Sequence, residues 1–546
     1  MPLEYKINEK QREKYRKLGY WGDATLVDYW QMAVRSVPGK TAVVDFQGKA
    51  FTYTELDEAS GRVAAYLQAQ GIGPGDFVTL LMPGWAEFTV IYLGCLKAGA
   101  ICNALCPNYS ERNLSYILNK CESKVLFFPY TFKKRNFFEV AEALRPNVPS
   151  LKQIVMVDKY QESTQCMTLE QVLRDYAPIR DDAKVNADEL AAVLFTSGTE
   201  GNPKGVMLTH NNIIAAEKAF AARVNFNSFD TILMPAPVGH ATGFHHGVTM
   251  PFLFGAKSVL QDIFIPENTL KLIEQEKCTC GMGATPFVHD ILRALKAAKH
   301  DISSLRYFLC GGAPIPRHMV KEAMQAGFKV LGVYGSTESV PHTATALHDA
   351  DDRIINSDGY AVAGVEIKIV DPSRNTLPPE TEGEEASRGP NVFVGYLREP
   401  ELTAKVLDEE GWYYSGDMCK MDADGYIRIT GRIKDIIIRG GENISSCEVE
   451  NFLSQHPNVR EIAVVSMPDE RLGEKVCAYV VLNDPAKGLT PEDLVAYFIE
   501  KKAPKYKCPE RIEIVDRLPR TESGKVQKFL LRQDIRNKLN IINNPA

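Results

Sequence analysis

The sequence lacks an apolar segment long enough to cross a membrane. Residues 77–105 are the most apolar region of the 546-residue chain, but Pro83-Gly84 interrupts it and it contains Glu87 and Lys97. This pattern predicts a strand followed by a buried helix rather than a membrane span. The first residues, Met1-Pro2-Leu3-Glu4-Tyr5-Lys6, are charged and contain no apolar signal-peptide core. We therefore expect a cytoplasmic protein without stable membrane insertion.

Paired cysteines and an excess of basic residues are also missing. The twelve cysteines are scattered. Cys278-Thr279-Cys280 forms the one tight pair, and a single intervening residue suits neither a zinc knuckle nor a redox motif. The net charge of −6 argues against a nucleic-acid partner, because nucleic-acid-binding domains are usually basic. The scattered cysteines indicate a reducing cytoplasm.

The chain is too long for a single core, so at least two domains are expected. Strand-like runs such as 41–45 alternate with helical stretches such as 54–70. This alternation predicts a large, multi-layer α/β domain with mostly parallel sheets. Residues 1–24 are charged and helix-forming, and we expect them to form an arm over this domain.

The composition changes after Arg432, where the pattern becomes that of a small α+β domain of roughly a hundred residues. We therefore expect an N-terminal domain over residues 1–432 and a small, mobile C-terminal domain over residues 436–546. Residues 433–435 would form the hinge between them.

Residues 196–205 combine three hydroxyl side chains, three glycines and one lysine between two apolar runs. Glycines let backbone N–H groups turn toward an anion, hydroxyls add neutral donors, and Lys204 adds a positive charge. Lys204 lies between Pro203 and Gly205 in a hairpin, whereas the lysine of a Walker A loop follows a glycine and opens a helix. The segment predicts a triphosphate site; the alternative is an ordinary surface turn.

A second signal is Val333-Tyr334-Gly335-Ser336-Thr337-Glu338. Tyr334 offers a ring on which adenine could stack. Glu338 is a single carboxylate after a strand, and magnesium is commonly bound through one or two carboxylates together with substrate phosphates.

Asp417 follows the aromatic segment Gly411-Trp412-Tyr413-Tyr414-Ser415-Gly416, and Arg432 follows about fifteen residues later. A carboxylate can accept both hydroxyls of a ribose, and an arginine can bind the same sugar or its phosphate. The alternative is that Asp417 and Arg432 form a structural ion pair.

Two further strands end in small residues, at Gly283-Ala284 and at Gly311-Gly312-Ala313. Small residues leave room for a flat ligand beside the end of a strand. An ordinary strand-to-helix turn would show the same pattern.

In this order, the motifs resemble those of the adenylate-forming superfamily of acyl-CoA synthetases, luciferases and peptide-synthetase adenylation domains. The resemblance runs from about Thr25 to Leu531 and is closest to medium-chain fatty-acid and cyclohexanecarboxylate CoA ligases. The phosphate loop and the Gly524-Lys525 turn are its most specific parts. Asp358-Gly359-Tyr360-Ala361-Val362-Ala363-Gly364 departs from the glycine-serine-valine-glycine segment that is more usual there.

The resemblance implies a role for each matching residue. It places Lys525, Thr196, Glu338 and His240 in the catalytic set, with Glu338 holding Mg²⁺ and His240 lining the acyl pocket rather than acting as an acid or base. The implied ATP and AMP contacts are Thr196, Ser197, Gly198, Thr199, Gly201, Lys204, Gly312, Ala313, Tyr334, Gly335, Ser336, Thr337, Asp417, Arg432 and Lys525. The implied acyl pocket comprises His240, Phe244, Gly283 and Gly311, the coenzyme A channel comprises Arg439, Gly440 and Gly441, and the hinge residue is Lys434.

The expected activity is that of an ATP-dependent acyl-CoA synthetase in fatty-acid metabolism. A carboxylic acid would be activated as acyl-AMP with release of pyrophosphate, and coenzyme A would then displace AMP. The sequence leaves a homodimer open. One alternative is another use of the adenylate, in loading a carrier protein or in luciferase-like oxidation. The other is a nucleotide-binding scaffold without turnover, against which the presence of both Lys525 and Glu338 argues.

Overall fold

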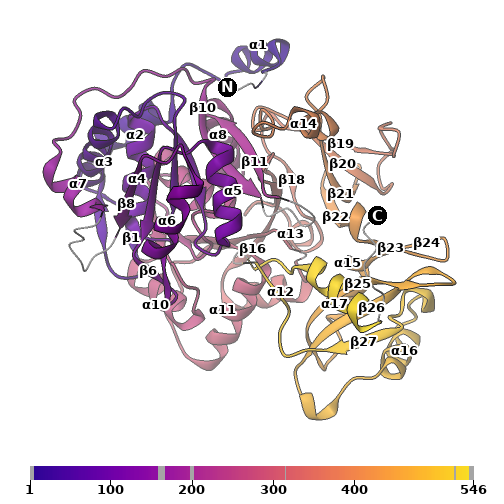
Figure 1. Ribbon diagram of the computed structural model, residues 1–546. Helices are drawn as coiled ribbons and strands as arrows, with labels where there is room; N and C mark the ends of the chain where they lie inside the picture. Colours follow the sequence, from indigo (N-terminus) through magenta and orange to yellow (C-terminus); the bar gives the residue numbers. More distant parts are fainter. Residues whose placement is uncertain are drawn as a thin grey trace. The chain divides into compact units, whose positions relative to one another are not determined.

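The structure is a computed structural model that describes residues 5, 7–157, 166–196, 202–313, 315–521 and 524–539. The chain divides into two compact units (Figure 1). The first unit comprises residues 1–366 and 387–413, and the second comprises residues 367–386 and 414–546. The segment 433–435 lies inside the second unit, and its role as a hinge stays a prediction.

The first unit is built on two large, mostly parallel sheets, as predicted. Nine strands form one sheet in the order β18 (Tyr360–Ala361), β17 (Val340–Ala344), β16 (Lys329–Ser336), β15 (Tyr307–Gly311), β14 (Cys280–Gly283), β12 (Thr231–Met234), β13 (Lys257–Leu260), β1 (Thr41–Asp45) and β2 (Ala50–Thr52). Seven strands form the other in the order β11 (Lys204–Thr209), β10 (Leu190–Thr196), β4 (Ile101–Leu105), β3 (Phe77–Leu81), β5 (Val125–Pro129), β8 (Gln153–Val157) and β9 (Met167–Thr168).

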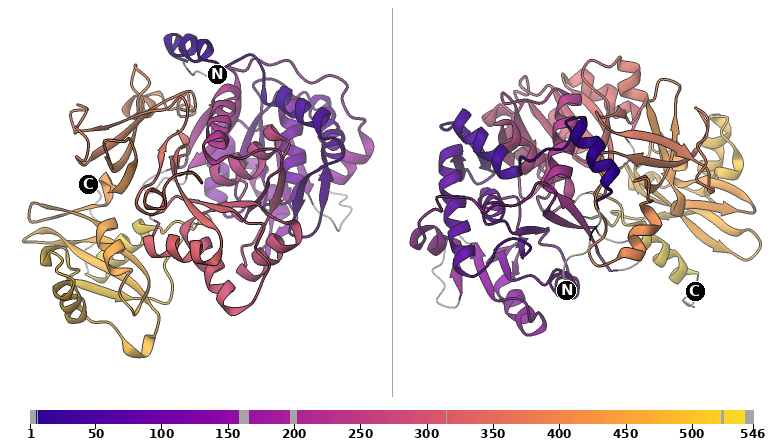
Figure 2. Two further views of the ribbon diagram at one scale, coloured as in Figure 1. Left: turned by 180° about the vertical axis from the view of Figure 1, so that it is seen from behind. Right: turned by 90° about the horizontal axis from the view of Figure 1, so that it is seen from above.

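Helices flank these strands, as the views from behind and from above show (Figure 2). They are α1 (Glu9–Lys17), α2 (Leu26–Ser36), α3 (Tyr53–Ala69), α4 (Ala86–Lys97), α5 (Glu111–Cys121), α6 (Phe137–Leu144), α7 (Leu169–Asp175), α8 (His210–Val224), the π-helical turn η2 (Gly243–Thr249), α9 (Met250–Phe254), α10 (Pro266–Glu276), α11 (Thr285–Ala297), α12 (Arg317–Ala326), α13 (Asp351–Asn356) and α14 (Pro400–Val406). Capping residues fix several of their starts. Thr52 and Thr209, for example, form capping boxes that begin α3 and α8.

Helix α4 is buried along its whole length because it packs against β1 of one sheet and against β3 and β4 of the other. This confirms the predicted strand and buried helix of residues 77–105. Both charged residues of the helix are paired. Glu87 accepts from Lys49 at 2.8 Å, and the Lys97 ammonium lies 2.6 Å from Asp57. Buried charges require such partners.

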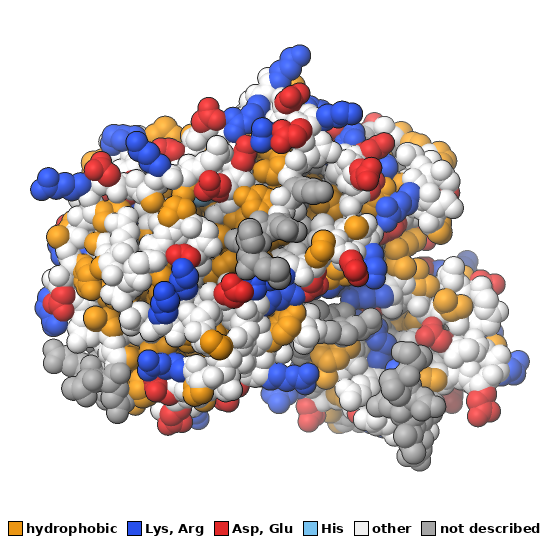
Figure 3. All heavy atoms as spheres, turned by 45° about the horizontal axis from the view of Figure 1, so that its top comes forward, with side chains coloured by type: hydrophobic (Ala, Val, Ile, Leu, Met, Phe, Trp, Pro, Cys, Tyr) orange, Lys and Arg blue, Asp and Glu red, His pale blue; other side chains and the backbone are white. Residues whose placement is uncertain are grey.

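The described residues include no helix that is long and apolar enough to cross a membrane. On the face drawn in Figure 3, Lys and Arg side chains are interspersed with Asp and Glu, without a broad basic surface among the residues coloured there.

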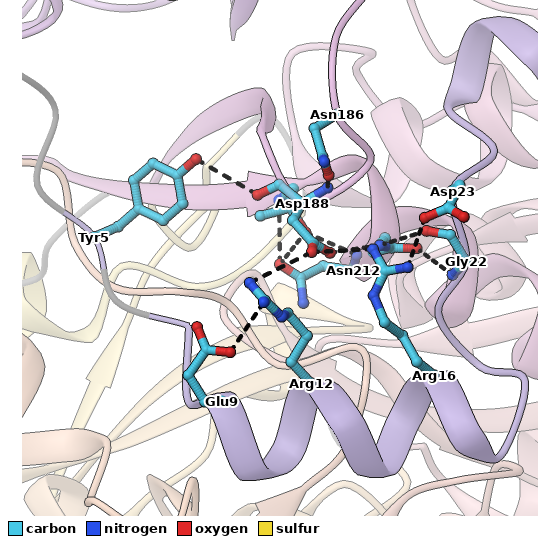
Figure 4. Close-up of polar contacts among 11 residues, drawn as sticks. Tyr5, Glu9, Arg12, Arg16, Gly22, Asp23, Asn186, Asp188 and Asn212 are labelled. Atoms are coloured by element: carbon cyan, nitrogen blue, oxygen red, sulfur yellow. Dashed lines mark hydrogen bonds and ion pairs between the residues drawn. The ribbon is translucent and has the colours of Figure 1, made fainter.

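Helix α1 forms the predicted N-terminal arm and is held by charge. Arg16 lies 3.1 Å and Arg12 4.0 Å from the Asp188 carboxylate (Figure 4). This carboxylate also accepts from Asn211 at 2.7 Å. Lys14 pairs with Glu366 at 2.7 Å. The arm is thereby fixed to the segment that leads into β10.

The second unit contains two smaller sheets. The first consists of β19 (Glu366–Val370), β20 (Gly383–Arg388), β21 (Tyr413–Met421) and β22 (Ile427–Arg432). The second consists of β24 (Glu442–Ser445), β23 (Ile436–Arg439), β26 (Gly473–Leu482) and β25 (Val459–Asp469), with β27 (Arg511–Ile514) paired to β26. Helices α15 (Ser446–Leu453), α16 (Pro491–Glu500) and α17 (Lys528–Lys538) pack on this sheet and bury a separate hydrophobic core on each of its faces.

Candidate active site

The predicted phosphate loop joins two antiparallel strands at the edge of the seven-stranded sheet. Thr196 ends β10 and stands directly opposite Lys204, which begins β11. The ladder therefore fixes both ends of the loop. A side chain at Gly205 would be crowded here, because a Cβ at its position would lie 3.0 Å from the Phe195 ring. The predicted ligands Ser197, Gly198, Thr199 and Gly201 lie outside the described residues.

Strand β11 has a second partner on its other side, in residues 394–397. The Leu397 N–H donates to the Gly205 carbonyl at 2.7 Å, and the Met207 N–H donates to the Gly395 carbonyl at 3.0 Å. This pairing places Tyr396 beside the start of β11. The Lys204 ammonium lies 5.2 Å from the centroid of the Tyr396 ring, which is within cation–π distance.

Glu338 lies in the tight turn between β16 and β17 and is 8% exposed. The Tyr396 hydroxyl donates to Glu338 Oε1 at 2.8 Å. Tyr396 therefore contacts both predicted ATP-site residues, Lys204 and Glu338, which are far apart in the sequence. Burial raises the pKa of Tyr396, and the neighbouring Glu338 carboxylate raises this pKa further, so the hydroxyl keeps its proton and acts as a donor.

The turn that carries Glu338 is closely packed and has an unusual backbone. Val340 is fully buried and has a φ of +51°, which is rare for a β-branched residue and marks local strain. A Cβ at Gly335 would lie 2.3 Å from the Val340 carbonyl oxygen, so only glycine fits there. Ser339 supports the turn through a hydrogen bond of 2.9 Å with His342 Nδ1.

Tyr334 and Ser336 lie on β16 next to this turn. The Tyr334 ring is half-buried and packs edge-on against the ring of His342, with the two centroids 5.0 Å apart. The Ser336 hydroxyl lies 3.1 Å from that of Ser339. Thr337 completes the turn between Ser336 and Glu338. Their predicted contacts with the nucleotide stay predictions.

Asp417 and Arg432 are paired to each other in the second unit. They face one another on β21 and β22, and Arg432 Nε lies 3.0 Å from Asp417 Oδ1. The ion pair that the sequence left open as an alternative is thus present. Their predicted contacts with ribose or phosphate stay predictions, and the Arg432 side chain is still 47% exposed.

The turn carrying Lys525 is held by its backbone. The Thr521 N–H donates to the Lys525 carbonyl at 2.8 Å, and the Lys525 N–H donates to Thr521 Oγ1 at 3.1 Å. Arg520 donates to the Gly524 carbonyl at 2.6 Å and pairs with Glu461 at 2.6 Å. Residues 522–523 lie outside the described residues.

Gly440 and Gly441 form the two-residue turn between β23 and β24. Their φ angles are +59° and +92°, as a type I′ hairpin turn requires. Arg439, just before this turn, pairs with Glu510 at 2.5 Å. Lys434 lies exposed in the 3₁₀ turn η3 (Ile433–Asp435). The coenzyme A and hinge roles of these residues stay predictions.

The predicted acyl-pocket residues occupy different environments. Phe244 is fully buried, with its ring centroid 4.7 Å from that of Tyr92, whereas His240 is half-buried. A Cβ at Gly283 would lie 2.4 Å from the Phe287 ring, and one at Gly311 would lie 2.4 Å from the Val333 carbonyl oxygen.

Protein atoms thus lie close to Gly283 and Gly311 on the side where a side chain would project, and room for a ligand beside these strand ends stays a prediction. Gly312 has a φ of +77° and is followed by Ala313 in the same loop, which fits the strand-to-helix turn left open as the alternative. The place of His240, Phe244, Gly283 and Gly311 in an acyl pocket stays a prediction, and so do the nucleotide contacts of Gly312 and Ala313.

Sequence reasoning missed a buried charged cluster. Glu217 of α8 has its Oε2 atom 3.0 Å from His246 Nδ1 and its Oε1 atom 3.4 Å from His245 Nδ1. All three side chains are fully buried. The histidines lie on η2, immediately after Phe244. The adjacent pair His245-His246 was visible in the sequence, but their partner was not, because Glu217 is about thirty residues away on a helix that carries other polar residues.

Tyr396 was also missed, since the segment around it reads as scaffold. Its glycine and aromatic neighbours, Gly395 and Phe393, predict only a short β-element. The pairing of residues 394–397 with β11 gives Tyr396 its position, and such long-range pairing leaves no local signal.

Comparisons with known proteins support the resemblance to adenylate-forming enzymes that the sequence shows. The chain matches the AMP-binding enzyme family over residues 30–397 and the AMP-binding enzyme C-terminal domain over residues 448–525. A medium-chain fatty-acid–CoA ligase of Escherichia coli (strain K12) is 56% identical over 539 residues, which cover 99% of this chain and 95% of that protein. The human mitochondrial medium-chain acyl-CoA ligase ACSF2 is 31% identical and covers 94% of this chain and 87% of its own length.

Solved structures agree over nearly the whole chain. The anthranilate CoA ligase AuaEII in complex with anthranoyl-AMP has a TM-score of 0.87 at 25% identity, covering 95% of this chain and 98% of its own. ATP-bound MatB from Rhodopseudomonas palustris has a TM-score of 0.85 at 28% identity, covering 94% and 100%. The family match spans more than half of the chain and the first relative spans almost all of it. The chain therefore belongs to the AMP-binding enzyme family.

Proposed function

We propose that the protein is an ATP-dependent acyl-CoA synthetase that forms an acyl adenylate and then an acyl-CoA thioester. The observation that supports this most directly is the meeting of Lys204 and Glu338 around Tyr396. A cation at the phosphate loop and a carboxylate suited to a metal are the two charges that binding of a triphosphate requires.

The chemistry follows from the poor reactivity of a carboxylate toward a thiol. In the first step a carboxylate oxygen attacks the α-phosphorus of ATP, the bond to the β-phosphate bridging oxygen breaks, and pyrophosphate leaves. In the second step the thiol of coenzyme A loses its proton and its sulfur attacks the acyl carbon. The bond from that carbon to the phosphate oxygen breaks, and AMP leaves with the oxygen. The protein contributes by positioning the reactants and stabilising the charge that develops.

Each predicted residue has a defined task in this scheme. Thr196, Lys204 and the loop between them hold the β- and γ-phosphates, and Tyr334 stacks on the adenine. Asp417 and Arg432 bind the ribose and its phosphate, and Lys525 stabilises charge during adenylation. The glycine turn of β23 and β24 serves the pantetheine channel in the second step.

Glu338 fits a magnesium ligand. It is a single, nearly buried carboxylate whose Oε1 is held by Tyr396. Among the described residues, no group of three or more His, Cys, Asp or Glu side chains could hold a metal ion. A single carboxylate such as that of Glu338 suits Mg²⁺, which is often bound through one or two carboxylates plus substrate phosphates. When bound, the ion would supply positive charge to the phosphates.

For the substrate, we propose a medium-chain or cyclic carboxylic acid. The most similar protein reported above is named for medium-chain fatty acids and is 56% identical to this chain. A rate screen over acetate, octanoate, decanoate, cyclohexanecarboxylate and ferulate tests this choice. Preference for acetate, with octanoate and cyclohexanecarboxylate inert, would contradict it.

The decisive experiment separates the two half-reactions in Lys525→Ala. The variant should lose acyl-AMP formation from acid and ATP on the order of 10²-fold or more, because an ammonium contributes most where charge develops away from water. Supplied with synthetic acyl-AMP and coenzyme A, it should still form thioester. Lys487→Ala is the matched control, since Lys487 is a lysine of the same unit that is 75% exposed.

The same assays distinguish the alternatives. Pyrophosphate release without thioester, in the presence of free coenzyme A, would favour carrier-protein loading or oxidation of the adenylate. The absence of pyrophosphate release with every acid would favour a nucleotide-binding scaffold. Equal damage to both half-reactions in Lys525→Ala would contradict the assignment of Lys525 to adenylation alone. A cytoplasmic location and a homodimer belong to this proposal and are tested by fractionation and by the mass in solution.

A further inference from the structure

Tyr396 connects the two most strongly predicted parts of the ATP site. Its hydroxyl donates to Glu338 Oε1 at 2.8 Å, and its ring lies 5.2 Å from the Lys204 ammonium. The residue is 3% exposed.

Backbone pairing and ring packing hold Tyr396 in this position. It forms a β-bridge with Val206 of β11, and its N–H donates to Thr403 Oγ1 at 2.9 Å. The Phe393 ring packs edge-on against it, with centroids 5.0 Å apart. A side chain fixed in this way can impose a geometry on its neighbours, because its own rotamer is locked by packing.

We propose that Tyr396 is a positioning residue that orients the Glu338 carboxylate for magnesium and holds the Lys204 ammonium at the phosphate loop. This inference rests on the proposed function, because it concerns the ATP site described there. Because the Tyr396 hydroxyl occupies Glu338 Oε1, the other carboxylate oxygen, Oε2, remains for other partners. The ring face attracts the ammonium without neutralising it, so Lys204 keeps its charge for phosphate.

The two contacts predict separable effects. A hydrogen bond to a charged group typically changes an equilibrium by about 10-fold to 100-fold. Tyr396→Phe removes this bond and keeps the ring. It should raise the free Mg²⁺ concentration at half-maximal pyrophosphate release by about 10-fold, while changing the KM for ATP at saturating Mg²⁺ little. Tyr396→Leu also removes the ring and should raise that KM by about threefold or more.

Tyr53→Phe is the matched control. Tyr53 is fully buried, and its hydroxyl donates to the Ala256 carbonyl at 2.7 Å, far in sequence from the ATP-site residues. It therefore reports the general effect of losing a buried tyrosine hydroxyl. Because the control should leave the Mg²⁺ requirement unchanged, a shift confined to Tyr396→Phe would not be a folding effect. Tyr396→His, which keeps a ring and an N–H donor, should need less Mg²⁺ than Tyr396→Leu.

Glu338→Gln completes the test and separates the two proposals. It should raise the Mg²⁺ requirement by itself, and adding Tyr396→Phe should then raise it no further, because Tyr396 acts on magnesium only through the Glu338 carboxylate. If Glu338→Gln leaves the requirement unchanged, the magnesium role of Glu338 fails and the role of Tyr396 fails with it. If Glu338→Gln raises it but Tyr396→Phe matches the control, or if Tyr396→Phe lowers it, only the inference about Tyr396 is overturned.

Discussion

Asp57→Asn should destabilise the first unit far more than Lys97→Met does, although both break the same ion pair. Lys97 ends α4 with its side chain only 4% exposed, and its ammonium lies 2.6 Å from Asp57 Oδ1. The Asp57 side chain is 29% exposed and also accepts from Trp30 Nε1 at 2.7 Å. Without the Asp57 carboxylate, the buried Lys97 ammonium loses its ion-pair partner. Without Lys97, the carboxylate that remains at Asp57 is partly hydrated.

The size of the effect follows from burial. Leaving a buried charge unpaired typically costs about 3–5 kcal/mol. Asp182 is close enough for the charge of Lys97 to act on it: burial raises the pKa of Asp182, and Lys97 opposes that rise. Because Asp182 balances part of the charge, we expect Asp57→Asn to cost about 3 kcal/mol, the lower end of that range. Lys97→Met should cost at most about 1 kcal/mol, since methionine fills the site without a charge.

These costs convert into melting temperatures. Unfolding entropy is about 2.1 cal/mol/K per residue, so a unit of about 390 residues loses roughly 4 °C of Tm for 3 kcal/mol and about 1 °C for 1 kcal/mol. Calorimetry at one fixed scan rate measures this, because unfolding of a multidomain chain depends on the rate. The double variant should recover most of the loss. Equal shifts in the two single variants would refute the argument from burial.

Three further predictions test other parts of the structure. Gly335→Ala should abolish pyrophosphate release and lower the yield of folded protein, because its Cβ would lie 2.3 Å from a backbone oxygen, whereas Gly73→Ala, with no atom within 4 Å, should be nearly silent. Burial raises the pKa of Glu217, but the charge and hydrogen bonds of His246 and His245 outweigh this and bring it to about 2, below the usual 4.5. Stability from Glu217 is therefore present above pH 4.5 and lost as the pH falls toward 2, so Glu217→Gln should flatten the decrease of Tm over that range. Rate constants for octanoate should exceed those for acetate in both half-reactions, as competition assays would show.

Much of the fold could be predicted because its signals are local. The apolar strands and the alternation of strands with helices are visible in short windows, and so is the buried helix α4 that follows Pro83-Gly84. The glycine pair at 440–441 likewise indicates a turn within a short window. Motifs of this kind need no knowledge of the rest of the chain.

The glycines at the strand ends show what local reasoning leaves open. Gly283 and Gly311 look like openings for a ligand, yet the Phe287 ring and the Val333 carbonyl oxygen occupy the space that a side chain would take. A glycine signals close approach of something, and the sequence does not say whether that something is a ligand or another part of the fold. Only the packing distinguishes the two.

Strand β11 shows why a scaffold segment and a site residue cannot be separated in this protein. One edge of β11 pairs with β10 and sets Thr196 opposite Lys204, while the other pairs with residues 394–397 and brings in Tyr396. Tyr396 in turn reaches Glu338, on the turn of a different sheet. A change that shifts residues 394–397 along β11 by one position would turn Tyr396 to the opposite face, because side chains alternate along a strand. It would then remove the contacts with Lys204 and Glu338 together, without altering any residue that the motifs identify.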